Sequence, residues 1–279
     1  MKNTYKIAVT SLLVTIFCGN ASALENRESG VTWDDAENCL SSGVGETCKT
    51  IKAKILDIKY QAAVTDAVTA EEKEKANNLL AINPENNQLV WNESGTKLLV
   101  VTWKATGAYE NFLKPYTATS DNEEYVTWVT LAPQVQEFCS NFLENSSRNA
   151  KEDLDVRLKQ YHGLNSSWGY DVFVELWVSP EDLFRPCVDP ETNDAACELD
   201  FGKTTPVVKN IKDYKEFYKN LYYKSFRSSA PVPWTGLGYT YDWGNKRSEV
   251  GASEFILVPN APYEIGRVIP TIDYCTHNY

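Results

Sequence analysis

The sequence predicts an α+β protein in which a helical N-terminal part packs on a mixed or mainly antiparallel sheet and disulfides staple the fold. Three observations predict this class. Apolar residues recur at helical spacing in the first third of the mature chain, the middle of the chain changes to short runs rich in Val, Thr and Trp, and the cysteine count is even once an export segment is removed. No internal repeat or long linker divides the chain, so we expect one α+β domain over residues 24–279.

The first 23 residues are organised like a signal peptide. Two lysines precede an uncharged apolar run over residues 7–17, which is shorter than the ~20 residues that span a bilayer, and Ala21-Ser22-Ala23 is a small-x-small cleavage pattern. A lipidated Cys18 is the alternative, but the bulky Phe17 stands where a lipoprotein peptidase needs a small residue. We expect cleavage after Ala23 and a periplasmic or secreted protein without a transmembrane segment.

Six cysteines remain after this cleavage, and an oxidising compartment favours three disulfides. The short spacings predict two of these disulfides, each across a short loop, and elimination gives the third. The expected pairs are Cys39 with Cys48, Cys187 with Cys197, and Cys139 with Cys275.

Charge and composition exclude several classes of function. The chain has 27 Lys and Arg against 38 Asp and Glu, a net charge of −11 at pH 7, which repels nucleic acid and anionic membranes. Only His162 and His277 are available for a His-rich zinc site or a Ser-His-Asp arrangement. His162 lies in the last turn of an expected helix, where the helix dipole favours a cation, so we interpret it as a capping residue. No P-loop or GxGxxG motif occurs, and we expect no cofactor.

The N-terminal third has helical patterns. An acidic segment, Trp33 to Leu40, precedes a second segment after Cys48 in which isoleucines recur at helical spacing. Thr69 and Glu72 then form a capping-box pattern that predicts a charged surface helix ending near Leu80.

The middle of the chain predicts two strands and two helices. Residues 98–104 and 125–131 have strand composition. Pro133 begins a helix that directs Cys139 inward, and Asn149 caps a further helix that ends by Gly163.

Residues 170–178 alternate as a strand and place Glu175 between Phe173 and Trp177. A carboxyl buried against rings has a raised pKa and can donate a proton at neutral pH. The alternative is that Glu175 pairs with an Arg or Lys on a neighbouring strand, or that it is exposed on an outer face of the sheet. Asp171 is about 13 Å away along the strand, so a catalytic partner must come from elsewhere, and Asp242 is our candidate.

An acidic loop follows this strand. It offers oxygen ligands at positions 1, 3, 5 and 12 of a 12-residue loop, as an EF-hand does, from Asp189, Glu191, Asn193 and Asp200. Asp194 stands where the turn needs Gly, the last ligand is Asp, and no long helix flanks the loop. We therefore expect an ordinary acidic surface loop, held by its disulfide, and no metal site. If calcium does bind, these four residues are the candidate ligands.

The densest aromatic segment begins with a helix after Tyr214 and continues in a strand over residues 239–243, with a partner strand at 253–258. Rings at every second position suit stacking on sugar rings or gripping an extended peptide. A buried sheet face is the alternative. The candidate binding residues are Trp234, Tyr239, Tyr241 and Trp243.

Two functional hypotheses follow. The first is a non-catalytic exported binding or interaction protein that uses this aromatic surface, with a glycan or an extended peptide as partner. The second is an exported hydrolase that acts on a glycan or cell-envelope substrate, with Glu175 and Asp242 as acid and base.

Overall fold

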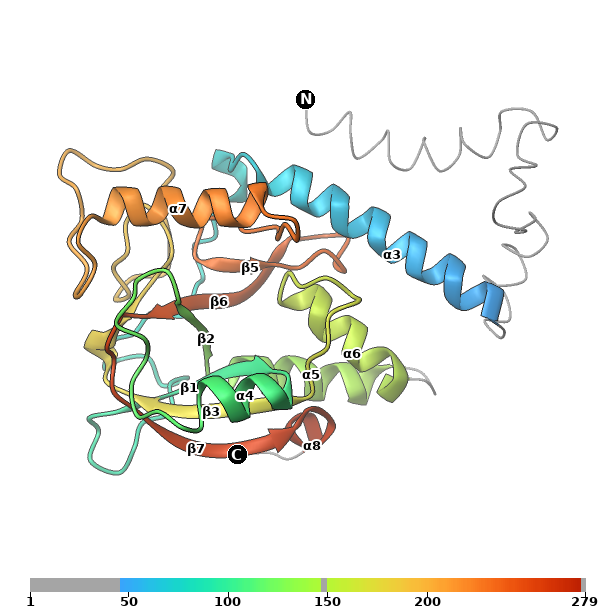
Figure 1. Cartoon of the computed structure of the whole chain (residues 1–279), viewed down its shortest axis with the longest axis horizontal. Coiled ribbons are helices and arrows are strands. Elements are labelled where there is room, and N and C mark those ends of the chain that lie inside the picture. The colour runs from blue at the N-terminus through green and yellow to red at the C-terminus, as the bar shows by residue number, and fades with distance from the viewer. Residues whose placement is uncertain (1–45, 147–149, 277–279) are drawn as a thin grey trace. The chain divides into compact units, whose positions relative to one another are not determined.

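The computed structural model describes residues 46–146 and 150–276 (Figure 1). The chain divides into two compact units, Met1–Asp66 and Ala67–Tyr279, and each is described by itself. Helix α3, Glu46–Ala67, accounts for the described part of the first unit and covers the isoleucine repeat that predicted a helix. The expected signal segment and the segment Trp33 to Leu40 lie outside the described residues.

The second unit is built on one antiparallel sheet, so the predicted α+β class is confirmed. Seven strands pair in the described residues, in the order β4-β6-β2-β1-β3-β7 with β5 also on β6. Every pairing between them is antiparallel. The strands are β1 (Leu98–Lys104), β2 (Thr127–Leu131), β3 (Val172–Val178), β4 (Leu183–Phe184), β5 (Tyr239–Tyr241), β6 (Val250–Leu257) and β7 (Tyr263–Pro270).

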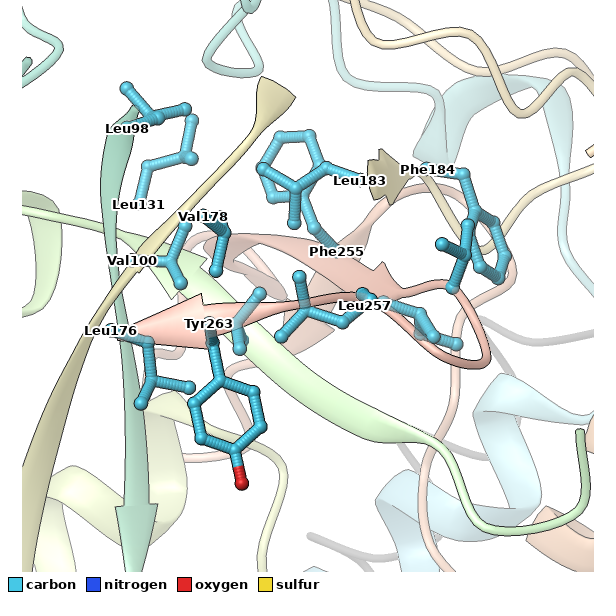
Figure 2. Packing of buried hydrophobic residues seen from close by; sticks show 14 of the residues in the cluster. Leu98, Val100, Leu131, Leu176, Val178, Leu183, Phe184, Phe255, Leu257 and Tyr263 are labelled. Carbon is cyan, nitrogen blue, oxygen red and sulfur yellow. The ribbon is translucent and has the colours of Figure 1, made fainter. Parts of the chain in front are cut away.

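The sheet curls because β6 and β7 are consecutive in the chain but are separated by three strands. On a flat sheet they would lie roughly 19 Å apart, at ~4.8 Å per strand. Their connection contains a turn, in which the Ala261 N–H donates to Val258 O at 3.2 Å, and such a turn spans less than ~7 Å. The edge strands therefore approach each other, and Figure 2 shows Leu183 of β4 and Tyr263 of β7 in the same hydrophobic cluster.

The sheet curls around a face that forms the main core. Cross-strand partners lie on the same face, and Val100 is opposite both Leu131 and Leu176. Further members of this cluster in Figure 2 are Leu98, Val178, Leu183, Phe184, Phe255, Leu257 and Tyr263. Helix α7, Tyr214–Arg227, joins the same cluster through Tyr214, Phe217 and Leu221, three members of the inward stripe that its sequence predicts.

The opposite face of β1 and β3 packs against three helices: α5 (Gln134–Asn145), α6 (Ala150–Tyr161) and α8 (Thr271–Thr276). Their shared cluster includes Val101, Phe173, Leu154, Leu158 and Tyr274. Leu154 and Leu158 form the buried face of α6, while Asn149, the predicted cap of this helix, lies outside the described residues.

Two disulfides join segments of the second unit. Cys139 of α5 bonds to Cys275 of α8, and Cys187 bonds to Cys197 across the acidic loop, which are the two pairings expected there. Cys48 is also disulfide-bonded, while Cys39 lies outside the described residues, so their pairing stays a prediction. These bonds are typical of a protein that matures in an oxidising compartment.

The charged helix predicted over residues 69–80 is wrong. Only a single 3₁₀ turn, η1 (Glu72–Glu74), forms there. The Leu79 N–H donates to Ala195 O at 3.0 Å, and the Leu80 N–H donates to Ser253 Oγ at 2.8 Å. Long-range partners therefore take the backbone donors that a helix would use. Helix α4 (Thr106–Phe112) is a short element that no pattern predicted. The 3₁₀ turn η2 (Pro180–Asp182) follows Ser179 and begins at Pro180, as the Ser-Pro pair in the sequence predicts.

Across the described ranges, no helix combines the length and the hydropathy that a bilayer-crossing segment needs.

Candidate functional site

A pocket of about 250 Å³ lies against β1, β2 and β6, and its lining takes in consecutive residues of β1 and β2, so both faces of these two strands contribute. Val101 is opposite Thr130, and Thr130 is opposite Glu254, so these three residues share one face across β1, β2 and β6. Trp103 and Trp128 are two residues along their strands from Val101 and Thr130, and alternation places them on the same face. These five residues all line the pocket.

Three segments from other parts of the chain complete the lining. They are the loop after α6, the last turns of α7, and the segment that leads into β5. The remaining lining residues are Thr102 and Lys104 of β1, Val129 of β2, and, from these three segments and the residue Tyr170 before β3, His162, Gly163, Leu164, Tyr170, Ser225, Val232, Pro233, Trp234, Tyr239, Thr240 and Tyr241.

The end of α6 brings His162 to the pocket. Gly163 has a φ of +67°, which only glycine adopts easily, and Leu164 N–H donates back to Lys159 O at 2.8 Å. The predicted stop at Gly163 is thereby confirmed. A Cβ at Gly163 would lie 3.3 Å from the backbone N and O of Tyr241, so the loop packs closely on β5.

Trp103 is the central ring of one pocket wall. It stacks on Tyr170 and on Phe173, with ring centroids 5.1 and 5.4 Å away, and its centroid lies 5.9 Å from that of His162. Its indole Nε1 donates to Thr271 Oγ1 at 2.8 Å. Packing and hydrogen bonding therefore fix the orientation of this ring.

Trp234 lines the pocket from the segment before β5. Its ring packs on Tyr218 with centroids 5.0 Å apart, and the residue is 6% exposed. Its Nε1 is buried, and no described residue accepts a hydrogen bond from it. Buried polar groups normally have partners, so this N–H is an unsatisfied donor at the pocket wall, with no surface of its own open to the pocket.

Glu254 is the acidic group of the pocket. It keeps part of its surface facing the cavity, yet burial of the carboxyl raises its pKa to about 8. Among the described residues, none forms an ion pair or hydrogen bond with this carboxyl. Desolvation disfavours the charged form, so the carboxyl is mostly protonated at neutral pH.

His162 and Lys104 shift in the direction expected for buried bases. Burial lowers the pKa of His162 to about 4, so its ring is neutral at pH 7. The His162 Nε2 is buried and has no hydrogen-bond partner among the described residues. Burial also lowers the pKa of Lys104, whose side chain makes no ion pair with any described residue.

These observations single out one cavity in which titratable groups with perturbed pKa values meet free hydrogen-bonding groups and aromatic rings. Perturbed titratable groups gather at functional sites more often than elsewhere. The pocket is therefore the candidate functional site.

The two catalytic candidates from the sequence lie outside this pocket. Glu175 accepts from Arg267 Nε and Nη2, each at 2.7 Å, which is the neighbouring-strand pairing named as the alternative. Asp242 accepts from Arg157 Nη1 and Nη2 at 2.7 and 2.6 Å. The structure does not bring the two carboxylates together at the pocket. Each carboxylate is buried and forms a bidentate ion pair with an arginine, of which Arg267 is half exposed.

The four aromatic candidates are each less than a tenth exposed, so they form no open docking platform. Trp234, Tyr239 and Tyr241 instead line the pocket. Trp243 does not, and its Nε1 donates to Leu164 O at 3.1 Å. A binding role for the first three stays a prediction, now at a partly open pocket.

The acidic loop gathers some of the calcium candidates. Carboxylate oxygens of Asp189, Glu191 and Asp194 lie within 4.8 Å of one another, while the Asp200 carboxylate does not belong to this group. The loop closes around a protein cation, because Arg185 Nη1 donates to Asp194 Oδ1 at 2.8 Å and Nη2 donates to Asp194 O at 2.9 Å.

Sequence reasoning missed Lys104 and Glu254 and treated His162 as a helix cap. The available signal was a single charged residue inside or ending an otherwise apolar strand, as in Leu98–Lys104 and Val250–Leu257. Such a residue either meets a partner or faces a cavity, and the sequence does not say which.

Comparison of the chain with protein-family models, with curated proteins and with solved structures finds no match, so a functional proposal must rest on the chemistry of the pocket.

Proposed function

We propose that this protein is an exported, non-catalytic binding protein that holds a small molecule in the pocket over β1, β2 and β6. The observation that carries the proposal is a cavity lined by aromatic rings in which the Glu254 carboxyl has no ion-pair or hydrogen-bond partner among the described residues. A ligand that exchanges hydrogen bonds with this carboxyl would offset part of the cost of burying it. The signal-like segment and the disulfides support export to the periplasm or beyond.

The size of the cavity supports a ligand with a single ring. Its volume of about 250 Å³ is below the ~300–1,000 Å³ of drug-sized sites. The aromatic residues of the lining, Trp128 and Trp234 among them, give it the apolar surface that a flat ring or the apolar face of one sugar unit needs. An extended peptide needs an open groove, and the enclosed rings of this site favour the small ligand instead.

A hydrolase is the second candidate, now centred on Glu254. A carboxyl with a pKa of about 8 is protonated at neutral pH, which is what a general acid requires. Glu254 is, however, the one carboxylate among the described residues that line the pocket, so a carboxylate pair is lacking there. The geometry therefore favours binding over hydrolysis.

The binding proposal is tested by filling the cavity. Ser225 lines the pocket from α7, and Ser225→Phe would place a ring in it. Ser229→Phe is the matched control, because Ser229 is exposed just beyond the end of the same helix. The probes are N-acetylglucosamine, phenylacetamide and phenylacetate at millimolar concentration, with the fluorescence of the pocket tryptophans and thermal melting as readouts.

We expect at least one probe to bind the wild type and Ser229→Phe alike, and to lose about tenfold or more in affinity with Ser225→Phe. If no probe binds, or if Ser225→Phe binds like the wild type, the proposed function is wrong. Release of 4-nitrophenol from 4-nitrophenyl N-acetylglucosaminide by the wild type, abolished in Glu254→Gln, would favour the hydrolase instead.

A further inference from the structure

We infer that the ligand of this pocket carries a neutral amide group, which bridges the parted ends of β1 and β2 through their backbone. This inference rests on the proposed binding function and specifies the class of its ligand. The observation that carries it is the strand pairing at the pocket, where Trp103 and Trp128 are not paired with each other although their strands are neighbours.

The strands β1 and β2 separate at the pocket. Their pairing covers two residues of each strand and ends at Val101 and Thr130. Residues 102–104 then continue beside β3, and residues 127–129 continue beside β6. Residues from both of these strand ends line the pocket, which therefore lies where the two strands part.

The backbone groups of Trp103 and Trp128 are directed into this gap. Successive residues of an antiparallel strand direct their N–H and C=O groups to opposite sides. The Ala132 N–H of the β2 side donates to Leu99 O of β1 at 3.2 Å. Trp128 and Trp103 are each four residues from this pair, and no register shift interrupts the pairing of β1 with β3 or of β2 with β6. Their N–H and C=O groups therefore point toward the opposite strand, and no strand of the described ranges pairs with them there.

This gap offers donors and acceptors in equal number, two N–H and two C=O groups. A carboxylate would match the N–H groups and leave the carbonyls unpaired, and an ammonium group would do the reverse. The N–H and the C=O of a trans amide point in opposite directions. One amide can therefore donate to one strand and accept from the other, as a peptide group of an inserted strand would. Backbone groups removed from water normally have partners, and the bridging amide would supply them.

The walls beside the gap suit the rest of such a molecule. Aromatic residues of the lining, among them Trp234 and Tyr241, provide an apolar surface for a ring. Glu254 lies opposite Thr130, which is two residues from Trp128, and its carboxyl can exchange a further hydrogen bond with the amide. The class that we assign is a small neutral molecule with one amide group next to an apolar ring.

The experiment compares an amide with its ester isostere. The probes are N-methylphenylacetamide and methyl phenylacetate, in which an oxygen replaces the N–H, and their affinities are measured by tryptophan fluorescence and calorimetry. Hydrogen exchange of the backbone N–H groups is followed by NMR on protein with isotope-labelled tryptophan, since the chain has only eight tryptophans. Trp177 is the internal control, because its strand is paired at this residue on both sides.

We expect the wild type and Ser229→Phe to bind the amide about tenfold or more tightly than the ester, because the ester leaves a backbone carbonyl unpaired. The amide should slow the exchange of the Trp103 or the Trp128 N–H by about tenfold and leave that of Trp177 unchanged. Ser225→Phe should lose both effects. The wild-type measurements alone test the inference should this variant fail to fold.

Three other outcomes separate the inference from the proposed function. If amide and ester bind equally, and Ser225→Phe weakens both, the amide inference is overturned and the binding function stands. If the amide is preferred but neither exchange rate changes, a side chain such as Glu254 recognises the amide, and the backbone inference is again overturned while the binding function stands. If neither probe binds, both are overturned.

Discussion

Replacing Glu254 with Gln tests whether burial controls the protonation of the pocket. Gln resembles a protonated Glu in shape and cannot ionise. Burial raises the pKa of the Glu254 carboxyl from the ordinary 4.5 to about 8, and no counter-ion offsets the burial among the described residues. The variant should therefore match the wild type at low pH and depart from it as the pH rises.

The magnitude follows from the two pKa values. The folded chain holds the Glu254 proton more tightly than the unfolded chain, so this contribution to stability is fully present below pH 4.5 and is lost as the pH rises through about 8. At ~1.4 kcal/mol per pH unit, the free energy of unfolding of the wild type should fall relative to Glu254→Gln by roughly 3 kcal/mol at pH 7 and about 5 kcal/mol above pH 8.

The assay is guanidinium unfolding at several values between pH 5 and pH 9, with the disulfides kept oxidised. His162 acts in the opposite direction, because its pKa is lowered to about 4 and stability is lost as the pH falls below its ordinary 6.5. Both proteins retain His162 and Lys104, so the difference between them isolates Glu254. Glu85→Gln, at an exposed turn, is the control and should follow the wild type at every pH.

A constant difference in stability between wild type and Glu254→Gln over this range would refute the reasoning. It would mean that the carboxyl ionises freely in the folded protein, and that water or a counter-ion reaches it.

Two further predictions concern the scaffold around the pocket. Gly238→Ala should destabilise the protein by about 3 kcal/mol or more, because a Cβ at φ +74° would lie 2.4 Å from Arg185 Cδ and 2.8 Å from Cys197 Sγ. A wild-type midpoint of chemical unfolding would contradict that prediction. The free energy of unfolding of the double variant Cys139→Ser, Cys275→Ser should be about 2–5 kcal/mol lower than that of the wild type. This disulfide joins residues 136 apart in the chain and restricts the unfolded state. Equal unfolding midpoints for the double variant and the oxidised wild type would show that the bond adds no stability.

Local sequence patterns correctly predicted the elements whose tertiary neighbours favour the same secondary structure. Strand β1 forms over Leu98–Lys104 as predicted, because an apolar run with β-branched residues suits a position in the middle of a sheet. Helix α7 begins after Asp213, whose side chain accepts from the Glu216 N–H, and it buries the stripe that its spacing predicts.

The pattern failed where distant partners competed with it. Between residues 69 and 80, the capping box indicated a helix, yet hydrogen bonds from Leu79 and Leu80 to residues more than a hundred positions away hold this stretch in an extended form. Local propensity contributes only tenths of a kcal/mol per residue, and long-range pairing of the backbone outweighs it.

The sequence by itself determined the class of fold, most of the strands and helices, and the disulfide pairs of the second unit. Only the tertiary structure decided which polar residues share a cavity. Lys104, His162 and Glu254 line one pocket because antiparallel pairing of β1, β2 and β6 and the end of α6 bring these segments together. Glu175 and Asp242 are also acidic residues within aromatic or apolar segments of the sequence, but in the structure they form ion pairs with arginines. The difference is physical, because the role of a buried charge depends on its neighbours in space, and those neighbours are distant in the chain.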